Sequence, residues 1–469
     1  MQFKHAPAAV SAGFDDPNLV SAAGLVPVMR LAQAAGLGSL AQERLSVPSD
    51  RGANAGGKVT ALVAGMLAGA DSIDDMNLLR HGGMSRLFDR VYAPSTLGSF
   101  LRAFQFGHVR QLDGVASRVL ANLASRAPLL QARAGERVMV DLDDTIIEVH
   151  GYGKQGAGFG YSGVRGLNAL LATASTLTSA PVILAQRLRK GAAGSPRGAA
   201  RIVADTLATL RRMDWPDDRP AVLVRADSAF YGHATIGTAL RAGAEVSVTV
   251  RMDPAVKAAI TLIPDDAWST IEYPDAIRDE ATGRWISRAE VAEVPFTAFR
   301  SRKKTEQVTG RLVVRRIPDL NPRNVEQPTL FDTWRHHAFF TTTDPETMDT
   351  VVADKTHRGH AIIEQVHADL KNGPLTHLPS GVFTANSAWL VLAVIAFNLT
   401  RTAGILADHG GKLAKATTAT IRRTLIHIPA RLARSARRIQ LHLPDTWPWE
   451  NAFARLFAIT HAPPPEAAT

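Results

Sequence analysis

Residues Glu136 to His150 read ERVMVDLDDTIIEVH, an apolar run interrupted by carboxylates. Apolar and more polar residues alternate in its first half, and this period of two predicts a β-strand with two distinct faces. Asp141 and Asp143 are therefore expected on one face and Asp144 on the other. Like charges on one face of an interior strand are costly unless a cation neutralises them. Two interpretations stay open: an edge strand with solvated acids, or a strand that holds a divalent metal.

The composition is that of a basic, folded protein without cysteine. The chain has 469 residues, 46% of them hydrophobic, and a net charge of +10. This length allows about three domains, and the charge favours a polyanionic partner such as nucleic acid, although a generally arginine-rich composition is the alternative. The absence of cysteine excludes disulfides, thiolate zinc sites and cysteine nucleophiles, and it fits a reducing cytosol.

No membrane or secretory segment is expected. The N-terminal residues lack the long apolar stretch of a secretory leader. The most apolar run, Ala388 to Asn398, is too short to span a bilayer and predicts a buried helix.

Residues 1–130 predict a helical, DNA-binding region. Apolar residues recur there at spacings of three and four, as in short helices joined by turns. Gly52-x4-Gly57-Lys58 imitates a phosphate-binding loop, but Val59 follows where Ser or Thr belongs and no strand precedes it. We therefore interpret this segment as a flexible loop.

The pattern changes to a mixed α/β sheet from residue 131 onward. Residues 131–251 predict strand, strand, strand, helix, strand, helix, strand. A Gly-rich segment at 151–166 joins the first two strands, where Lys154, Arg165 and two tyrosines can contact a backbone phosphate. Residues 252–335 predict a β-rich insertion, and 336–384 return to the core with a helix from Asp344-Pro345 to about Lys371. Residues 385–469 predict a basic, mostly helical region.

Two further acids stand out by their context. Asp227 follows an apolar strand in VRADSAFYG, and ligand sites in open sheets favour strand ends. Asp227 can equally be a helix N-cap. Glu364 lies in THRGHAIIEQVHADLKNG, where a continuous helix would align it with His357, His360, His367 and Lys371. A solvated helix face and a zinc site built on the histidines are the alternatives for this alignment.

These motifs together resemble the DDE-type insertion-sequence transposases. DLDDT on a first strand is followed by RADSAFYG and by a helix with Arg-x5-Glu-x6-Lys, in that order and with a large insertion before the helix. More narrowly, the chain resembles the branch called transposase DDE domain group 1. The resemblance implies an RNase H-like mixed sheet with helices, interrupted by the β-rich insertion and flanked by the two helical regions.

The resemblance also assigns residues. The D-x-T of the family matches Asp143-Asp144-Thr145, so Asp143 is expected as the first acid, with Asp141 as the fallback. Asp227 and Glu364 match the second and third acids. His357 and His360 stand where the family has tyrosine and arginine. The residues expected to contact DNA are Lys371, His357, Arg358, His360, His367, Arg302, Lys303 and Lys304.

The implied activity is Mg²⁺-dependent DNA cleavage and strand transfer. Three carboxylates suit two Mg²⁺ ions, which neutralise charge on the attacking and leaving oxygens, and Mn²⁺ is an expected substitute. The expected partners are double-stranded DNA, as terminal inverted repeats and as target, and a second copy in a homodimer. The expected location is the bacterial cytoplasm, associated with the nucleoid and not with a membrane. A nuclease of the same fold and a non-catalytic DNA-binding protein stay open as alternatives.

Overall fold

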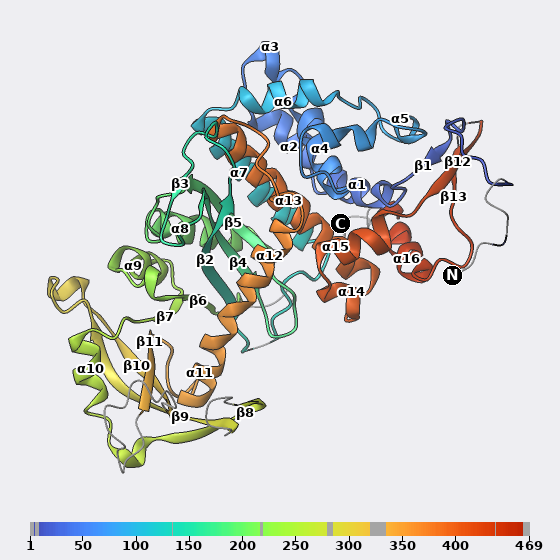
Figure 1. Cartoon of the computed structure of the whole chain (residues 1–469). Helices are drawn as coiled ribbons and strands as arrows, with labels where there is room; N and C mark the ends of the chain where they lie inside the picture. Colours follow the sequence, from blue (N-terminus) through green and yellow to red (C-terminus); the bar gives the residue numbers. More distant parts are fainter. Residues whose placement is uncertain are drawn as a thin grey trace, which may run out of the picture.

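A ten-stranded mixed sheet with helices on its faces forms the centre of the molecule (Figure 1). The computed structural model describes residues 4, 9–133, 135–215, 219–278, 285–318, 334–436 and 438–462, with only the backbone at 49, 272–278, 285–288 and 318. The strand order is β3-β4-β2-β6-β7-β11-β10-β9-β8, where β3 is the short strand Gly158–Phe159, and β5 pairs with β4. The predicted mixed α/β class is confirmed.

Five strands carry the part of the sheet that contains the acidic motifs. They are β2 (Val138–Glu148), β4 (Arg165–Ser175), β5 (Val182–Lys190), β6 (Val222–Ala226) and β7 (Glu245–Thr249). Helix α8 (Ala199–Leu210) precedes β6 and helix α9 (His233–Arg241) precedes β7, which confirms the predicted succession of strands and helices. β4 runs antiparallel to both β2 and β5, whereas β2, β6 and β7 are mutually parallel.

β2 is longer than its parallel neighbour, and this difference creates an opening. β6 ends at Ala226, which lies opposite Leu142. The next position on β2 is Asp143, and the next residue after β6 is Asp227. From there to Glu148, β2 pairs only with β4, because β6 has ended. Asp143 and Asp227 therefore lie at the carboxyl end of the parallel pair β2–β6, which is the edge where open sheets bind ligands.

The β-rich region joins this sheet instead of forming a separate one. Antiparallel to β7 lies β11 (Trp334–Thr341), followed by β10 (Val308–Pro318), β9 (Trp285–Ala298) and β8 (Ser269–Arg278). Helix α10 (Pro254–Ile260) connects β7 to this extension. Strands β8 to β11 lie at the end of the molecule opposite the N-terminal helices (Figure 1). The domain limits deduced from the sequence stay predictions.

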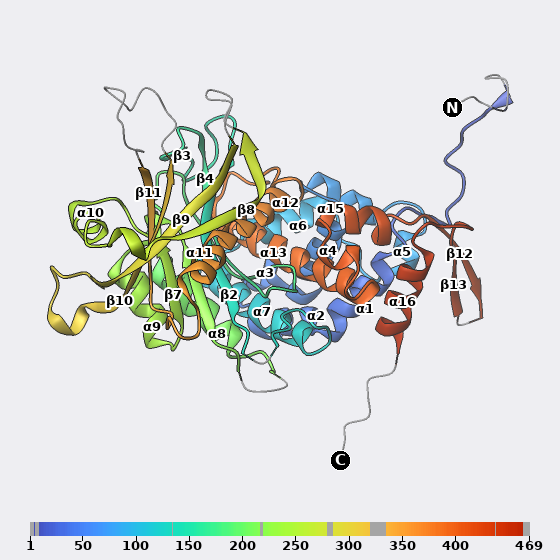
Figure 2. The same cartoon turned by 90° about the horizontal axis from the view of Figure 1, so that it is seen from below.

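The N-terminal and C-terminal helices form one helical body. The first group comprises α1 (Leu25–Ala34), α2 (Leu37–Arg44), α3 (Ser49–Gly52), α4 (Ala55–Leu67), the 3-10 helix η2 (Asp74–Leu79), α5 (Met84–Leu87), α6 (Pro94–Arg102) and α7 (Phe106–Ala124). The second comprises α13 (Phe383–Ala407), α14 (Lys412–Lys415), α15 (Thr418–Ile421), the π-helix η8 (Arg422–Ile426) and α16 (Glu450–His461). The two groups lie side by side in both views (Figures 1 and 2).

One sequence interpretation is wrong in these regions, and the mostly helical C-terminal region holds one addition. The supposed loop at Gly52 to Lys58 is largely helical, and Lys58 is buried with its Nζ donating to the carbonyl of Arg51 at 2.6 Å. The C-terminal region also contains the strands β12 (Ala430–Ser435) and β13 (Arg438–His442). β12 pairs with β1 (Leu19–Val20), a partner remote in sequence that local periodicity does not reveal.

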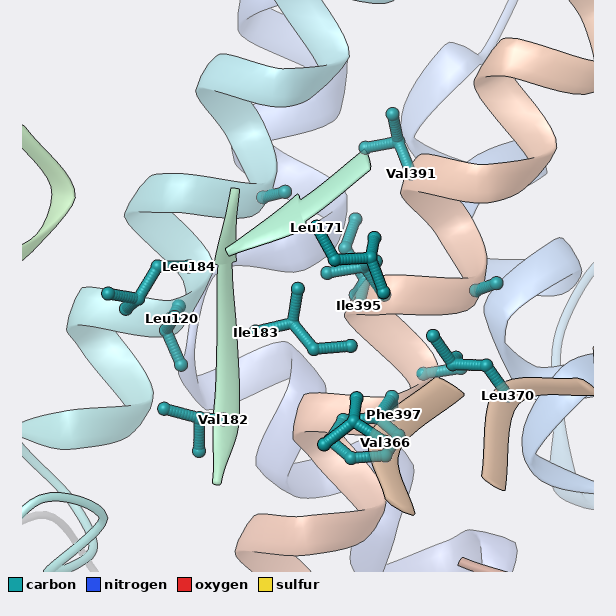
Figure 3. Packing of buried hydrophobic residues seen from close by; sticks show 14 of the residues in the cluster. Leu120, Leu171, Val182, Ile183, Leu184, Val366, Leu370, Val391, Ile395 and Phe397 are labelled. Carbon is teal, nitrogen blue, oxygen red and sulfur yellow. The ribbon is translucent and has the colours of Figure 1, made fainter. Parts of the chain in front are cut away.

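Helix α13 anchors the sheet to the helical body. Its length and composition would allow it to cross a membrane, but it is buried among α4, α7, α16 and β5, which confirms the predicted buried helix. Asn398 accepts from the Ile183 N–H at 2.9 Å and donates to the Ile183 carbonyl at 2.8 Å. This side chain therefore satisfies backbone groups on the edge strand β5. Figure 3 shows Ile183 packed beside Ile395 and Phe397.

The helix of the third acid is broken, contrary to the sequence prediction. α11 (Thr350–Arg358) ends in a 3-10 turn, η7 (Gly359–Ala361), before α12 (Ile362–Lys371) begins. The cap at the beginning of α11 is Asp349, which accepts from the Val352 N–H at 2.7 Å; the predicted start at Asp344-Pro345 is wrong.

Arg225 of β6 contacts the chain at that break. Its Nη1 donates to the carbonyl of Thr356, and a Cβ at position 359 would lie 2.8 Å from the same Nη1. A side chain at this position would require the guanidinium to shift. The Nε and Nη2 of Arg225 donate to Asp141 at 2.7 and 2.8 Å, and both side chains are buried. One guanidinium thus joins β2, β6 and the α11–α12 junction.

Breaking this ion pair is expected to be strongly destabilising. Arg225→Met leaves Asp141 as an unpaired buried charge, so the free energy of unfolding should fall by about 3–5 kcal/mol in urea denaturation. The double variant Asp141→Leu/Arg225→Met should recover most of that loss, because both charges are gone. Arg241→Met, at an exposed arginine, is the control and should change stability by about 0.5 kcal/mol or less. Equal stability of Arg225→Met and the control would contradict the assigned role.

Candidate active site

The three acids singled out in the sequence come together electrostatically. Asp143 on β2 is 29% exposed at its side chain, and Asp227 and Glu364 are exposed. Burial raises the pKa of Asp143 to about 7, and the negative charges of Asp227, Asp144 and Glu364 add to that rise. Carboxylates from β2, from the residue after β6 and from α12 therefore repel one another at the opening of the sheet.

Asp227 combines both roles that the sequence left open. Its Oδ1 accepts from the Ala229 N–H at 2.9 Å and caps the 3-10 helix η3 (Ser228–Phe230). The backbone N–H of Phe230 also acts on this carboxylate. Desolvation raises the pKa of Asp227, and the charge of Asp144 acts in the same direction. The cap thus fixes the carboxylate in place.

Asp141 and Asp144 are both held by arginines. Asp141 is fully buried, and Arg225 occupies both of its oxygens. Asp144 contacts Asn168 at 2.8 Å and Arg189, on β4 and β5. Of the three acids in DLDD, Asp143 alone has no cationic arginine or lysine partner among the described contacts. Its side chain is the one available to a ligand.

His367 is the nearest basic side chain to Asp143. Its Nδ1 lies 3.6 Å from the Asp143 Oδ2, and its Nε2 is buried without a hydrogen-bond partner among the described residues. Burial and then the charge of Lys371 lower the pKa of His367 to about 4. The imidazole is therefore neutral at pH 7. A neutral ring beside Asp143 suits positioning of that carboxylate better than the predicted contact with a phosphate.

The other predicted residues on α11 and α12 separate into distinct environments. His357 is buried, stacks on Phe339, and hydrogen-bonds Ser247 and Thr249 through its two ring nitrogens. Burial lowers its pKa well below the usual value, so the predicted phosphate contact does not fit this residue. The Nδ1 of His360 bonds the carbonyl of His357 at 2.6 Å, and the charge of His360 lowers the pKa of Asp227. His360 therefore lies near the carboxylates with its Nε2 available.

Arg358 and Lys371 flank the site. Arg358 pairs with Asp354 at 3.0 Å. Lys371 ends α12, and partial burial lowers its pKa. Its charge also acts on His367, which places it close to Asp143. The break at Gly359 therefore keeps His360, Glu364, His367 and Lys371 near the opening, while His357 turns into the core.

The basic run Arg302, Lys303 and Lys304 lies elsewhere. It forms an exposed turn between β9 and β10, where Arg302 pairs with Glu306 at 3.6 Å. Phe299, at the start of the same turn, stacks on Tyr231 with ring centroids 5.3 Å apart. This contact holds the turn against the segment that follows Asp227. None of the described contacts brings the three cations to the carboxylates.

The comparison with protein families agrees with this arrangement. A model of transposase DDE domain group 1 matches residues 4–464. The chain belongs to this family. A search of curated proteins gives no significant match. Transposase function is therefore supported by a match over nearly the whole chain, and transposases of this family act on DNA.

A divalent metal fits the donors of this transposase, although the described residues contain no group of three His, Asp or Glu side chains arranged to hold one. Hard cations such as Mg²⁺ prefer carboxylate oxygens, and repulsion among Asp143, Asp227 and Glu364 would be relieved by a cation. The three carboxylates are thus near enough for their charges to interact, but their oxygens do not converge on a single metal position.

Sequence reasoning missed the two arginines that organise the transposase site. Arg225 stands two residues before Asp227 in a buried strand, directly opposite Asp141 in the register. Arg189 occupies the corresponding place for Asp144 on β5. A cation inside the otherwise apolar strand β6 was the available signal for Arg225, because such a charge needs a buried partner. Arg189 stands among other polar residues of β5 and gave no such signal.

Neutralising Asp143 should stabilise the transposase at high pH. Because its pKa is raised from 3.8 to about 7, ionisation costs native stability as the pH rises through this window, and the cost is absent below about pH 4. Asp143→Asn should therefore increase the free energy of unfolding by about 1–3 kcal/mol at pH 8 and leave it unchanged at pH 4. Urea denaturation at the two pH values, without divalent metal, measures this. An equal effect at both pH values would contradict the raised pKa.

Proposed function

We propose that the protein is the transposase of an insertion sequence. It binds terminal inverted repeats, cleaves DNA in a Mg²⁺-dependent reaction and joins the cut end to target DNA. The observation that carries this proposal is that the carboxylates of Asp227 and Glu364 lie near enough to raise the pKa of Asp143, at positions that match the family's motifs.

We further infer that the catalytic core is RNase H-like. The support is the order β5-β4-β2-β6-β7, with three antiparallel strands followed by two parallel ones. The first acid lies on the central strand, the second follows its parallel neighbour, and the third comes from a helix after the β-rich insertion. This arrangement is expected of a mixed core that gathers acids from distant parts of the chain.

Asp143, Asp227 and Glu364 would hold the metal ions, and Asp141 drops out because Arg225 occupies both of its oxygens. When bound, two Mg²⁺ or Mn²⁺ ions would neutralise charge on the attacking and leaving oxygens of a phosphodiester. In the first reaction water displaces one oxygen of the scissile phosphate and leaves a 3′-hydroxyl. In the second, that hydroxyl displaces an oxygen of a target phosphodiester.

The neighbouring side chains then have distinct tasks. The cap at Ala229 N–H fixes the orientation of Asp227, and His367 positions Asp143 from 3.6 Å. Lys371 and His360, at the rim, suit contacts with phosphates next to the scissile bond. Arg302, Lys303 and Lys304, in the exposed turn after β9, suit backbone contacts farther along the duplex.

The partners follow from charge and from the reaction. A net charge of +10 favours a polyanion, and both terminal repeats and target DNA are double-stranded DNA. We assign repeat binding to the N-terminal helices, as the sequence predicts. Because two ends are joined to one target, a homodimer is the simplest assembly.

The carboxylates provide the direct test. Asp143→Asn, Asp227→Asn and Glu364→Gln should each reduce cleavage of DNA that carries the terminal repeats at least 1,000-fold in Mg²⁺, because each removes a metal-binding charge. Glu346→Gln, at an exposed acid before α11, is the control and should cleave normally. Cleavage and joining are followed on end-labelled DNA.

A second measurement separates metal binding from catalysis. Mg²⁺ should raise the melting temperature of the wild type and of Glu346→Gln, but have little effect on Asp143→Asn. Normal cleavage by all three active-site variants would exclude the enzyme function. Cleavage without any joined product would favour a Mg²⁺-dependent nuclease, and DNA binding without cleavage would favour a non-catalytic protein.

A further inference from the structure

The connection between β2 and β4 exposes three aromatic side chains within ten residues. Tyr152 is 93% exposed, Phe159 is 66% exposed, and Tyr161 is fully exposed. Single exposed apolar residues are common on protein surfaces, but several close together mark an interaction site. We call residues 149–164 the aromatic loop. The proposed cleavage and joining reactions assign no task to it.

The base of this loop is fixed although its rings are free. Gln155 donates its N–H to the Gly381 carbonyl at 2.9 Å and accepts from the Phe383 N–H at 3.1 Å. Lys154 Nζ donates to the Leu378 carbonyl. Gly156, with φ of +80°, lies against the Phe383 ring, where a side chain would be strained. Backbone groups of Leu378, Gly381 and Phe383 thus hold the base of the loop, so less backbone freedom is lost when the loop binds a partner.

The loop also lies in a segment of one charge sign. From Val149 to Ala204 the chain has no Asp or Glu. Its seven cations are Lys154, Arg165, Arg187, Arg189, Lys190, Arg197 and Arg201. Arg187, Arg189 and Arg201 pair with acids outside the segment, whereas the described contacts give the other four no ion pair. Arg165 lies over the ring of Tyr152 at 4.9 Å, so charge and aromatic surface coincide.

The aromatic loop directly follows β2, the strand that carries Asp143. Asp143 lies five positions before Glu148, the last residue of β2, which corresponds to about 17 Å along the strand. Over this length β2 pairs only with β4, because β6 ends opposite Leu142, and α12 packs against β2. DNA strands advance about 3.4 Å per nucleotide, so the loop begins about five nucleotides from a phosphate held at Asp143.

We propose that the aromatic loop is a stacking platform for unpaired bases of the DNA strand that leaves the carboxylate site. This inference rests on the proposed function and extends it to a second DNA contact. Exposed aromatic rings next to cations recognise single-stranded nucleic acid of any sequence, because every base presents a π-face. Paired bases inside a duplex offer no free face, so the platform selects strands that have separated near the cut.

Binding of single-stranded DNA tests the platform directly. The probe is a fluorescent 20-nucleotide oligothymidylate, measured by anisotropy with the full-length protein without divalent metal. The triple variant Tyr152→Ala/Phe159→Ala/Tyr161→Ala should bind at least tenfold more weakly than the wild type, because stacking is lost at several bases. The dependence of affinity on salt should stay unchanged, since no charge is removed. Replacing the same three residues by Trp should restore binding.

The matched control is Phe106→Ala, at a ring on α7 with 65% exposure, which should bind like the wild type. Duplex affinity of the triple variant should change less than twofold. Equal single-strand affinity of the triple variant and the wild type would overturn the inference, as would an equal loss in Phe106→Ala. A fall in oligomer mass by light scattering, with DNA binding intact, would assign the rings to a second copy of the chain and also overturn it. Failure of the wild type to bind any DNA would overturn the proposed function itself.

Discussion

The buried ion pair between Asp141 and Arg225 is the interaction on which the site depends. It joins two parallel strands side chain to side chain, and the remaining nitrogen of the guanidinium takes the carbonyl of Thr356 at the end of α11. A buried ion pair rarely adds much net stability, because desolvation offsets the attraction between the charges. Its contribution here is geometric. The guanidinium ties the sheet to the end of α11 and lies against Gly359, at the turn that precedes the helix of Glu364.

The three neighbouring acids on β2, Asp141, Asp143 and Asp144, differ in whether a cation neutralises their charge. Asp141 pairs with Arg225 of the adjacent strand β6, and Asp144 pairs with Arg189 of β5, on the far side of β4. Asp143 instead faces other carboxylates and a neutral imidazole. The buried arginines therefore neutralise Asp141 and Asp144, which support the sheet, whereas Asp143 has no arginine or lysine partner among the described contacts. A site of this kind is electrostatically incomplete without a ligand, and a cation is the ligand that relieves the repulsion.

The sequence was sufficient for features that depend on local periodicity. Alternation in Glu136 to His150 predicted the strand and its two faces, and the succession of apolar runs predicted the order of strands and helices around it. Features that depend on distant partners were not accessible. The turn at Gly359 is contacted by an arginine more than a hundred positions earlier, and β12 exists because residues 19–20 pair with it. His357 looked like part of a charged helix face until the turn directed it into the core. The choice of Asp143 over Asp141 needed either the family motif or the sight of Arg225 opposite Asp141.

The burial of α13 among the N-terminal helices constrains the order in which the molecule can form. α4, α6 and α7 pack their apolar faces against a helix that begins at Phe383, and the short strand β1 finds its partner only at Ala430. During synthesis the N-terminal helices therefore cannot bury their apolar faces until α13 has emerged from the ribosome. The same topology means that a product truncated before α13 would leave these apolar faces exposed. Only chains that extend through α13 can then complete the helical body.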